Sequence, residues 1–182
     1  DLVPVDEVSG QFDEYRSCDL ERSEDLDFDR RFDVVLLADV LEHVRNGRQL
    51  IRDAGRLGKP GARIIVSVPN IAIWFYRLSL LVGRFNYGPK GTLDETHVRF
   101  YTLDTIREAM RAGGLQVCSE RVTGLPFEVV FESTGRSRMI RLLDRGYFLL
   151  ARAWPRLFAY QLIVGAVSRE VTSGPVLRAP RS

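Results

Sequence analysis

Strand-like runs that alternate with helix-like segments constrain the fold of this chain more than any other feature. Residues 32–37 (FDVVLL) and 62–68 (ARIIVSV) are continuously apolar, as in strands buried on both faces of a sheet. Between them, apolar side chains recur at helical spacing through residues 50–57, and the sequence GKPG at 58–61 ends that helix. This order predicts an α/β fold in which helices cover both faces of a parallel sheet.

The rest of the chain continues the alternation. The further predicted elements are a strand at 15–18, a helix at 103–112, a strand at 115–122, a helix at 137–154 and a strand at 158–167. Thr102 suits the N-cap of the first of these helices, and Gly113 suits its end.

Composition places the chain among ordinary globular domains. Its 182 residues are 45% hydrophobic and 27% charged, which is enough for one domain with a core. The net charge of +2 gives no reason to expect nucleic-acid binding, but residues 1–60 carry −6 and residues 121–182 carry +6. We recognise neither a secretory signal nor an apolar run of bilayer-spanning length, and therefore predict a cytoplasmic location.

Two segments carry a resemblance to a known family. Residues 32–44 (FDVVLLADVLEHV) and 58–70 (GKPGARIIVSVPN), with a helix between them, resemble class I S-adenosylmethionine (SAM)-dependent methyltransferases. The chain looks closest to the ubiquinone-biosynthesis O-methyltransferase branch. It is also similar to the methyltransferase domains of bacterial proteins that carry a glycosyltransferase domain. The resemblance covers roughly residues 1–167.

The resemblance implies a Rossmann-like, doubly wound sheet with strand order 3-2-1-4-5-7-6, the seventh strand being antiparallel. The five predicted strands would be strands three to seven in chain order. Strand one, its glycine-rich turn and most of strand two would then precede Asp1. We therefore expect residues 1–168 to be a partial methyltransferase domain, inactive by itself, and residues 169–182 to be a disordered tail.

The resemblance also implies a cofactor site. In the family, an acidic residue after strand two binds the ribose hydroxyls, and residues after strand three contact the adenine. The end of strand four lies under the cofactor. The residues at these positions are Asp1, Asp19, Leu20, Ala38, Asp39 and Val40. For Asp19, the alternative is an ordinary solvated acid in an acidic loop.

Two carboxylates and an imidazole follow the predicted fourth strand at a spacing that suits a metal ion. Asp39, Glu42 and His43 lie at i, i+3 and i+4, so a helix beginning near Asp39 would place them on one face. Such ligands suit Mg²⁺ or Mn²⁺. Metal-dependent relatives add a distant histidine, for which His97 is the candidate. Many relatives carry a similar block without a metal, its Glu and His making structural hydrogen bonds.

His43 and His97 are also the candidate catalytic residues. Either imidazole could take the proton from an acceptor hydroxyl as the methyl group moves. Methyl transfer is an in-line displacement, so the protein mainly aligns the reactants and excludes water.

An aromatic segment follows the predicted fifth strand. Pro69 and Asn70, at the end of that strand, are expected to face the acceptor, and residues 71–101 are expected to form a lid. The lid carries Trp74 and Tyr76, which suit an apolar or aromatic-bearing acceptor. The alternative is that these aromatics only seal the lid against the domain.

Arginines interleave with apolar residues in the segment 133–156. We predict an inserted basic amphipathic helix in this segment, and the spacing favours a surface helix with its apolar stripe against the sheet. The alternative is a helix that lies on an anionic membrane, which here means the inner membrane, or docks a neighbouring domain.

The resemblance thus implies a SAM-dependent O-methyltransferase that acts on a hydroxyl of a glycan, a lipid-linked sugar or a quinone-like molecule. Two alternatives remain open. The methyl group could go to a nitrogen or carbon centre, or the chain could be a non-catalytic methyltransferase-like scaffold for an attached enzyme.

Overall fold

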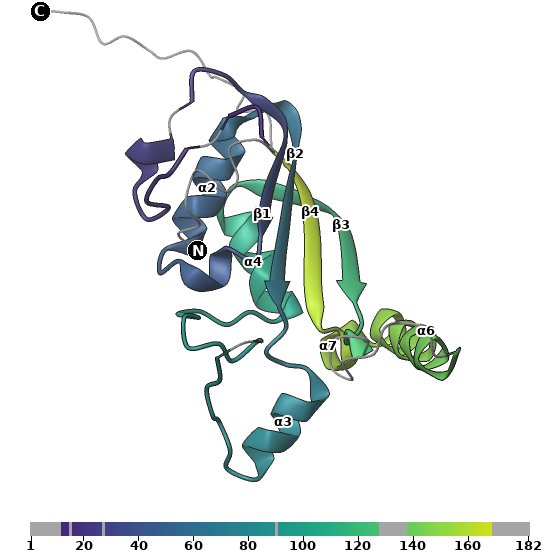
Figure 1. Ribbon diagram of the computed structural model, residues 1–182. Coiled ribbons are helices and arrows are strands. Elements are labelled where there is room, and N and C mark those ends of the chain that lie inside the picture. Colours follow the sequence, from purple (N-terminus) through teal and green to yellow (C-terminus); the bar gives the residue numbers. More distant parts are fainter. Residues whose placement is uncertain (1–11, 15, 27, 90, 128–137, 169–182) are drawn as a thin grey trace, which may run out of the picture.

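Four strands form one sheet in the order β1-β2-β4-β3 (Figure 1). The computed structural model describes residues 12–14, 16–26, 28–89, 91–127 and 138–168. The strands are β1 (Phe32–Ala38), β2 (Gly58–Pro69), β3 (Leu115–Thr123) and β4 (Gln161–Ser168). β1 and β2 are parallel, and β4 runs antiparallel to both of its neighbours. This is the order predicted for strands four to seven, so the α/β fold class is confirmed.

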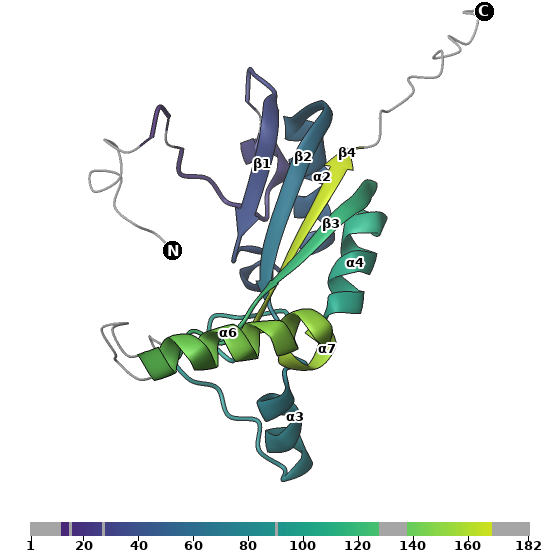
Figure 2. The ribbon, with the colours of Figure 1, turned by 90° about the vertical axis from the view of Figure 1, so that its right-hand side faces the viewer.

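Helices α2 and α4 cover the same face of the sheet (Figures 1 and 2). The helical elements are η1 (Ser23–Leu26), η2 (Leu41–His43), α2 (Gly47–Leu57), α3 (Trp74–Leu81), α4 (Leu103–Ala112), α6 (Arg138–Ala153) and α7 (Pro155–Phe158). Two connections join parallel strands, one from β1 through α2 to β2 and the other from β2 through α4 to β3, and both run in the same direction across the sheet. Because such connections are right-handed, both helices lie on the same face. The described residues thus contain one of the two expected helix layers, and no described helix covers the outer face of β1.

β1 is an edge strand, and its outer face is open. Val34 is 52% exposed and Leu36 is 62% exposed, so burial of this strand on both faces is not observed. The strand predicted at 15–18 is also absent, because described residues 16–18 adopt no regular structure. A strand at that position would need a neighbour beyond β1, and the described part of the sheet ends at β1.

The helix predictions follow from local sequence signals. The Asn46 side chain accepts a hydrogen bond from the Gln49 amide (3.3 Å) and caps α2. Thr102 and Thr105 form a capping box at the start of α4, which confirms the predicted N-cap. Side chains of α2 and α4, including Ile51 and Met110, belong to the same buried core cluster as residues of β2 and β4.

Two boundaries differ from the predictions. The sequence GKPG at 58–61 follows the end of α2 at Leu57, as predicted, but it already belongs to β2, which begins at Gly58 and not at residue 62; Gly58 pairs with Phe32 of β1. β4 begins at Gln161 and not at residue 158, because Pro155 occupies the first turn of the short helix α7.

The carboxyl ends of β1 and β2 point towards the end of the molecule that carries α3, α6 and α7 (Figure 1). α6 supplies the described part of the helix predicted at 133–156. The predicted tail at 169–182 lies outside the described residues. In the part of the chain that the structure describes, no helix has both the length and the apolar character needed to cross a bilayer.

Candidate functional site

Asp39 lies at the carboxyl end of β1 with a left-handed backbone (φ 51°), which is uncommon for a residue other than glycine. Its carboxylate accepts hydrogen bonds from the Ser67 hydroxyl (3.1 Å) and from Gln161 Nε2 (2.9 and 3.0 Å). These bonds join the adjoining ends of β1, β2 and β4. The element that follows Asp39 is the short 3₁₀ turn η2 and not an α-helix, so the one-face spacing of Asp39, Glu42 and His43 does not apply.

Glu42, in η2, is the outstanding polar group of the site. The residue is only 2% exposed, and neither of its carboxylate oxygens has a hydrogen-bond partner among the described residues. Burial, with a smaller contribution from Asp39, raises the pKa of Glu42 from 4.5 to about 7. A buried carboxyl group without a partner is costly to maintain, which indicates that a ligand satisfies it.

His43 and His97 lie beside this carboxyl group, with ring centroids 4.7 Å apart. Thr96 donates its hydroxyl proton to Asp94 (2.7 Å), so Nδ1 of His43 must donate to Thr96 Oγ1 (3.1 Å). Nδ1 of His97 contacts the carbonyl of Thr92 (2.9 Å), an acceptor, and so also carries a proton. In the neutral form of each ring, the unprotonated nitrogen is therefore Nε2.

Glu42, His43 and His97 each offer one ligand atom, and the three atoms lie within 4.8 Å of one another. In the part of the chain described, this is the one group of acids, histidines or cysteines with such geometry. The buried hydroxyl of Thr92 is also without a partner. The donor set fits a divalent cation, and the Nδ1 bonds are the outer contacts that orient metal-binding histidines. The group does not include Asp39, whose carboxylate bonds to Ser67 and Gln161.

The residues predicted to contact SAM occupy two places. Ala38 and Asp39 are exposed at the end of β1, and Val40 is half-buried against the core. Asp19 is exposed in the loop before η1, where its carboxylate accepts from the Glu21 amide (3.0 Å). Leu20 packs on the core cluster. Asp1 lies outside the described residues.

The predicted acceptor residues differ in environment. Asn70 is fully buried: its Nδ2 donates to the Ala159 carbonyl (2.9 Å), and its Oδ1 accepts from the Ala72 amide (3.0 Å). Its amide therefore joins the end of β2 to the start of β4. Pro69 is the half-buried last residue of β2. In α3, Trp74 is exposed and Tyr76 is half-buried.

The sequence did not predict the roles of Asp94 and Thr96, which orient the imidazole of His43. Asp94 and Thr96 belong to the loop sequence LDETHV, where the Asp94 carboxylate also accepts from the Thr96 amide (2.8 Å). These two hydrogen bonds from Thr96 hold the pKa of Asp94 below its usual value. An Asp two residues before a Thr is a recognisable turn signal, and here it places the hydroxyl that fixes His43.

The strand order, with one antiparallel inner strand, is the order that the methyltransferase resemblance implies for strands four to seven. The comparison with protein families agrees: a family described as "Methyltransferase domain" matches residues 5–120. The chain therefore belongs to this methyltransferase family.

Individual relatives are similar over part of their length. A ubiquinone biosynthesis O-methyltransferase of Coxiella burnetii (strain RSA 331 / Henzerling II) is 31% identical over 101 residues, which are 54% of this chain and 41% of the relative. One of Maricaulis maris (strain MCS10) is 36% identical over 91 residues, or 47% of this chain and 34% of the relative. The chain thus spans about two fifths or less of the length of these curated relatives.

Solved structures share the fold. A putative methyltransferase of Bacillus halodurans superposes with a TM-score of 0.53 at 14% identity, covering 91% of this chain and 77% of the other. A SAM-dependent methyltransferase of Archaeoglobus fulgidus gives a TM-score of 0.52 at 18% identity, with 90% and 71% covered. At these identities, the likeness establishes the fold.

Proposed function

We propose that the protein is a SAM-dependent methyltransferase that methylates a hydroxyl group, and that a divalent cation held by Glu42, His43 and His97 takes part. The observation that carries this proposal is the Glu42 carboxyl group, which is buried, has no hydrogen-bond partner among the described residues and lies beside His43 and His97. Family membership and the named activity of the relatives support methyl transfer to oxygen.

The residues at the carboxyl end of β1 would hold the cofactor. Ala38 and Val40 would pack against it, and Asp39 fixes the shape of the strand end through Ser67 and Gln161. Asp19, Leu20 and Asp1 would complete the site as the family resemblance implies. When bound, SAM supplies an electrophilic methyl group, and a divalent cation lowers the pKa of an acceptor hydroxyl.

The protein's own residues prepare the acceptor. Glu42, His43 and His97 each offer one ligand atom, and these atoms lie within 4.8 Å of one another, so the three residues can hold an ion or receive a proton there. Thr96 and the Thr92 carbonyl keep both rings in the tautomer that this task needs. The burial of Glu42 limits water at the same point, which strengthens electrostatic interactions.

The acceptor class follows from the relatives and from α3. The relatives are named for ubiquinone biosynthesis, which favours a quinone-like hydroxyl, and the aromatic residues Trp74, Phe75 and Tyr76 follow β2 directly. A hydroxyl on a glycan or a lipid-linked sugar remains in the proposal. A glycosyltransferase domain in the same protein and a cytoplasmic location remain predictions.

A methyl-transfer assay on the full-length protein tests this proposal, with labelled SAM and a catechol as a simple hydroxyl acceptor. Glu42→Gln keeps the size of the side chain but removes the charge, and should lower kcat/KM by at least about a hundredfold, the order expected when a group needed for acid–base or metal chemistry is lost. Glu95→Gln, an exposed residue of the loop that carries His97, is the matched control and should retain activity.

The dependence of activity on metal ions tests the proposed cation separately from methyl transfer itself. Chelation should abolish activity, and Mn²⁺ should restore it better than Mg²⁺, because two of the three ligands are imidazoles. Full activity after chelation would exclude a role for the cation and leave the histidines as the catalytic bases. Failure of SAM to bind the full-length protein would overturn the enzymatic proposal.

A further inference from the structure

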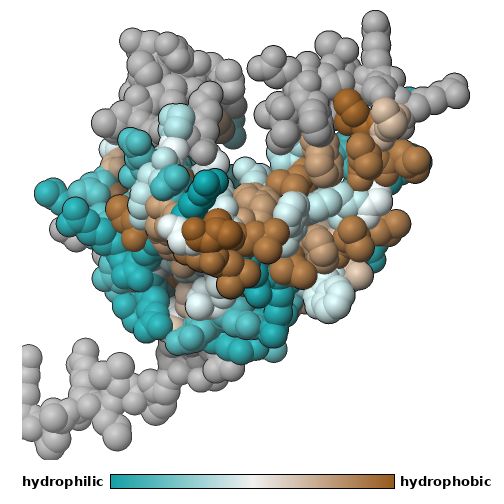
Figure 3. Space-filling model, turned by 90° about the horizontal axis from the view of Figure 1, so that it is seen from below, coloured by the Kyte–Doolittle hydropathy of each residue, from teal (hydrophilic) through white to brown (hydrophobic). Residues whose placement is uncertain are grey.

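The face of the molecule that carries α3 and α6 gathers exposed apolar side chains (Figure 3). Of the eighteen large hydrophobic side chains that are exposed in the described residues, fourteen lie in the segments 74–87 and 139–154. Leu81 is 80% exposed and Leu142 is 71% exposed. We call these two segments the α3–α6 face. Apolar exposure concentrated in this way marks a surface that binds a partner.

Specific contacts hold the two segments together. The Trp74 indole donates a hydrogen bond to the Tyr147 hydroxyl (3.1 Å), which joins the start of α3 to α6. Arg77 of α3 donates to the carbonyl of Arg156 in α7 (3.2 Å). The face is therefore one joined surface.

The charge around this face is almost entirely of one sign. Residues 71–93 and 138–158 contain eight arginines and lysines and a single acid, Asp144. Arg84, Arg145 and Arg152 are exposed, and none of the three pairs with an acid among the described residues. A second copy of this chain would set these positive charges against each other. An anionic partner matches them.

We propose that the α3–α6 face docks on an anionic lipid bilayer, with α3 and α6 lying in the interface. The combination matches this partner: apolar side chains enter the acyl boundary, arginines meet lipid phosphates, and Trp74, Tyr87 and Trp154 suit the headgroup level. α3 directly follows β2, so an apolar acceptor could pass from the bilayer to the site described above. Only this last step rests on the proposed function.

Vesicle flotation of the full-length protein, without SAM or acceptor, tests the docking separately from catalysis. We expect binding to vesicles of phosphatidylcholine and phosphatidylglycerol in equal parts, and little binding to phosphatidylcholine alone. Arg84→Glu and Arg145→Glu together should weaken the partition into anionic vesicles by at least about tenfold. Arg111→Glu, an exposed arginine of α4 outside the face, should leave it unchanged.

The apolar part of the face has its own variant. Leu81→Ser with Leu142→Ser should reduce vesicle binding, whereas Phe12→Ser, another exposed apolar residue, should not. Circular dichroism and Tm establish that each variant is folded. Equal binding to neutral and anionic vesicles, or no binding to either, would overturn the proposal. So would a wild-type protein that self-associates through this face, with the Leu81 and Leu142 changes converting it to a monomer.

Discussion

At the scale of single residues, the proposed metal site depends on Glu42. A carboxyl group that is 2% exposed, without a hydrogen-bond partner in the described part of the chain, has a pKa raised by burial to about 7. Burial makes the charged carboxylate of Glu42 costly in the free protein. A bound cation would offset that cost. The residue therefore links the stability of the protein to pH and to metal binding.

The pH dependence of stability provides a prediction at this scale. The pKa of Glu42 is raised from 4.5 in the unfolded chain to about 7 in the folded protein. Between these values the folded state holds the proton more tightly, so the free energy of unfolding falls as pH rises. In the absence of divalent ions, this loss should amount to up to about 3 kcal/mol. Urea denaturation across this pH range measures it.

Glu42→Gln should flatten this part of the pH profile, because the amide does not titrate, and Mn²⁺ should offset the loss in the wild-type protein but not in the variant. The exposed control Glu95→Gln should behave as the wild-type protein does. Identical profiles for Glu42→Gln and wild type would show that Glu42 does not titrate in this range.

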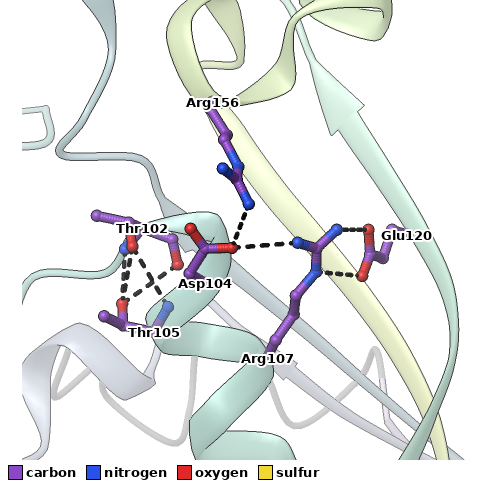
Figure 4. Close-up of polar contacts among 6 residues, drawn as sticks. All are labelled: Thr102, Asp104, Thr105, Arg107, Glu120 and Arg156. Carbon is purple, nitrogen blue, oxygen red and sulfur yellow. Dashed lines mark hydrogen bonds and ion pairs between the residues drawn. The ribbon is translucent and has the colours of Figure 1, made fainter.

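At the scale of elements, α4 is held by polar contacts at its start and along its length (Figure 4). The Thr102–Thr105 capping box closes its first turn. Arg107 donates two hydrogen bonds of 2.6 Å to the Glu120 carboxylate of β3 and one of 3.2 Å to Asp104, which also pairs with Arg156 of α7 (2.8 Å). This network connects α4 to β3 of the sheet and to Arg156 of α7.

We predict that Arg107→Met lowers the free energy of unfolding at neutral pH by about 1 kcal/mol, a value discounted because both partners are about one quarter to one third exposed. The hydrogen bond from Arg107 is the largest cause that lowers the pKa of Glu120. Its contribution is therefore present above the ordinary pKa of 4.5 and is lost as pH falls through the folded value.

Thermal unfolding at neutral and acidic pH measures this difference. Arg52→Met is a suitable control, because that exposed side chain bonds, among the described residues, only to Gln49 of its own helix. A destabilisation by Arg107→Met that persists unchanged at acidic pH would mean that packing of the side chain, and not the ion pair, stabilises α4.

The sequence predicted which segments form strands and helices better than it predicted the exposure and distant contacts of their side chains. Continuous apolar runs identified β1 and β2, and Thr102 identified the start of α4, because these signals are local. The same run in β1 could not reveal that Val34 and Leu36 are exposed, since that depends on what lies beyond the strand. The Asp39 carboxylate bonds to Gln161 of β4, and the Asn70 amide bonds to Ala159 just before β4; both partners lie about ninety or more residues away, so no local pattern reveals these bonds.

At the scale of the whole molecule, the candidate site and the α3–α6 face lie at the end of the sheet to which the carboxyl ends of β1 and β2 point (Figure 1). Sequence spacing brought His43 and Glu42 together, and the family resemblance named His97 as the distant partner. It also included Asp39, which the fold commits to Ser67 and Gln161 instead. The tautomers of both histidines come from the loop around Thr96, which only the folded chain brings to β1.

The most direct test of the central claim is a crystal of the full-length protein soaked in Mn²⁺, with anomalous scattering recorded at a wavelength where manganese scatters strongly. The account predicts one strong peak coordinated by a Glu42 carboxylate oxygen and by Nε2 of both His43 and His97. A map with no peak there, and with both Glu42 oxygens hydrogen-bonded to protein groups, would contradict it.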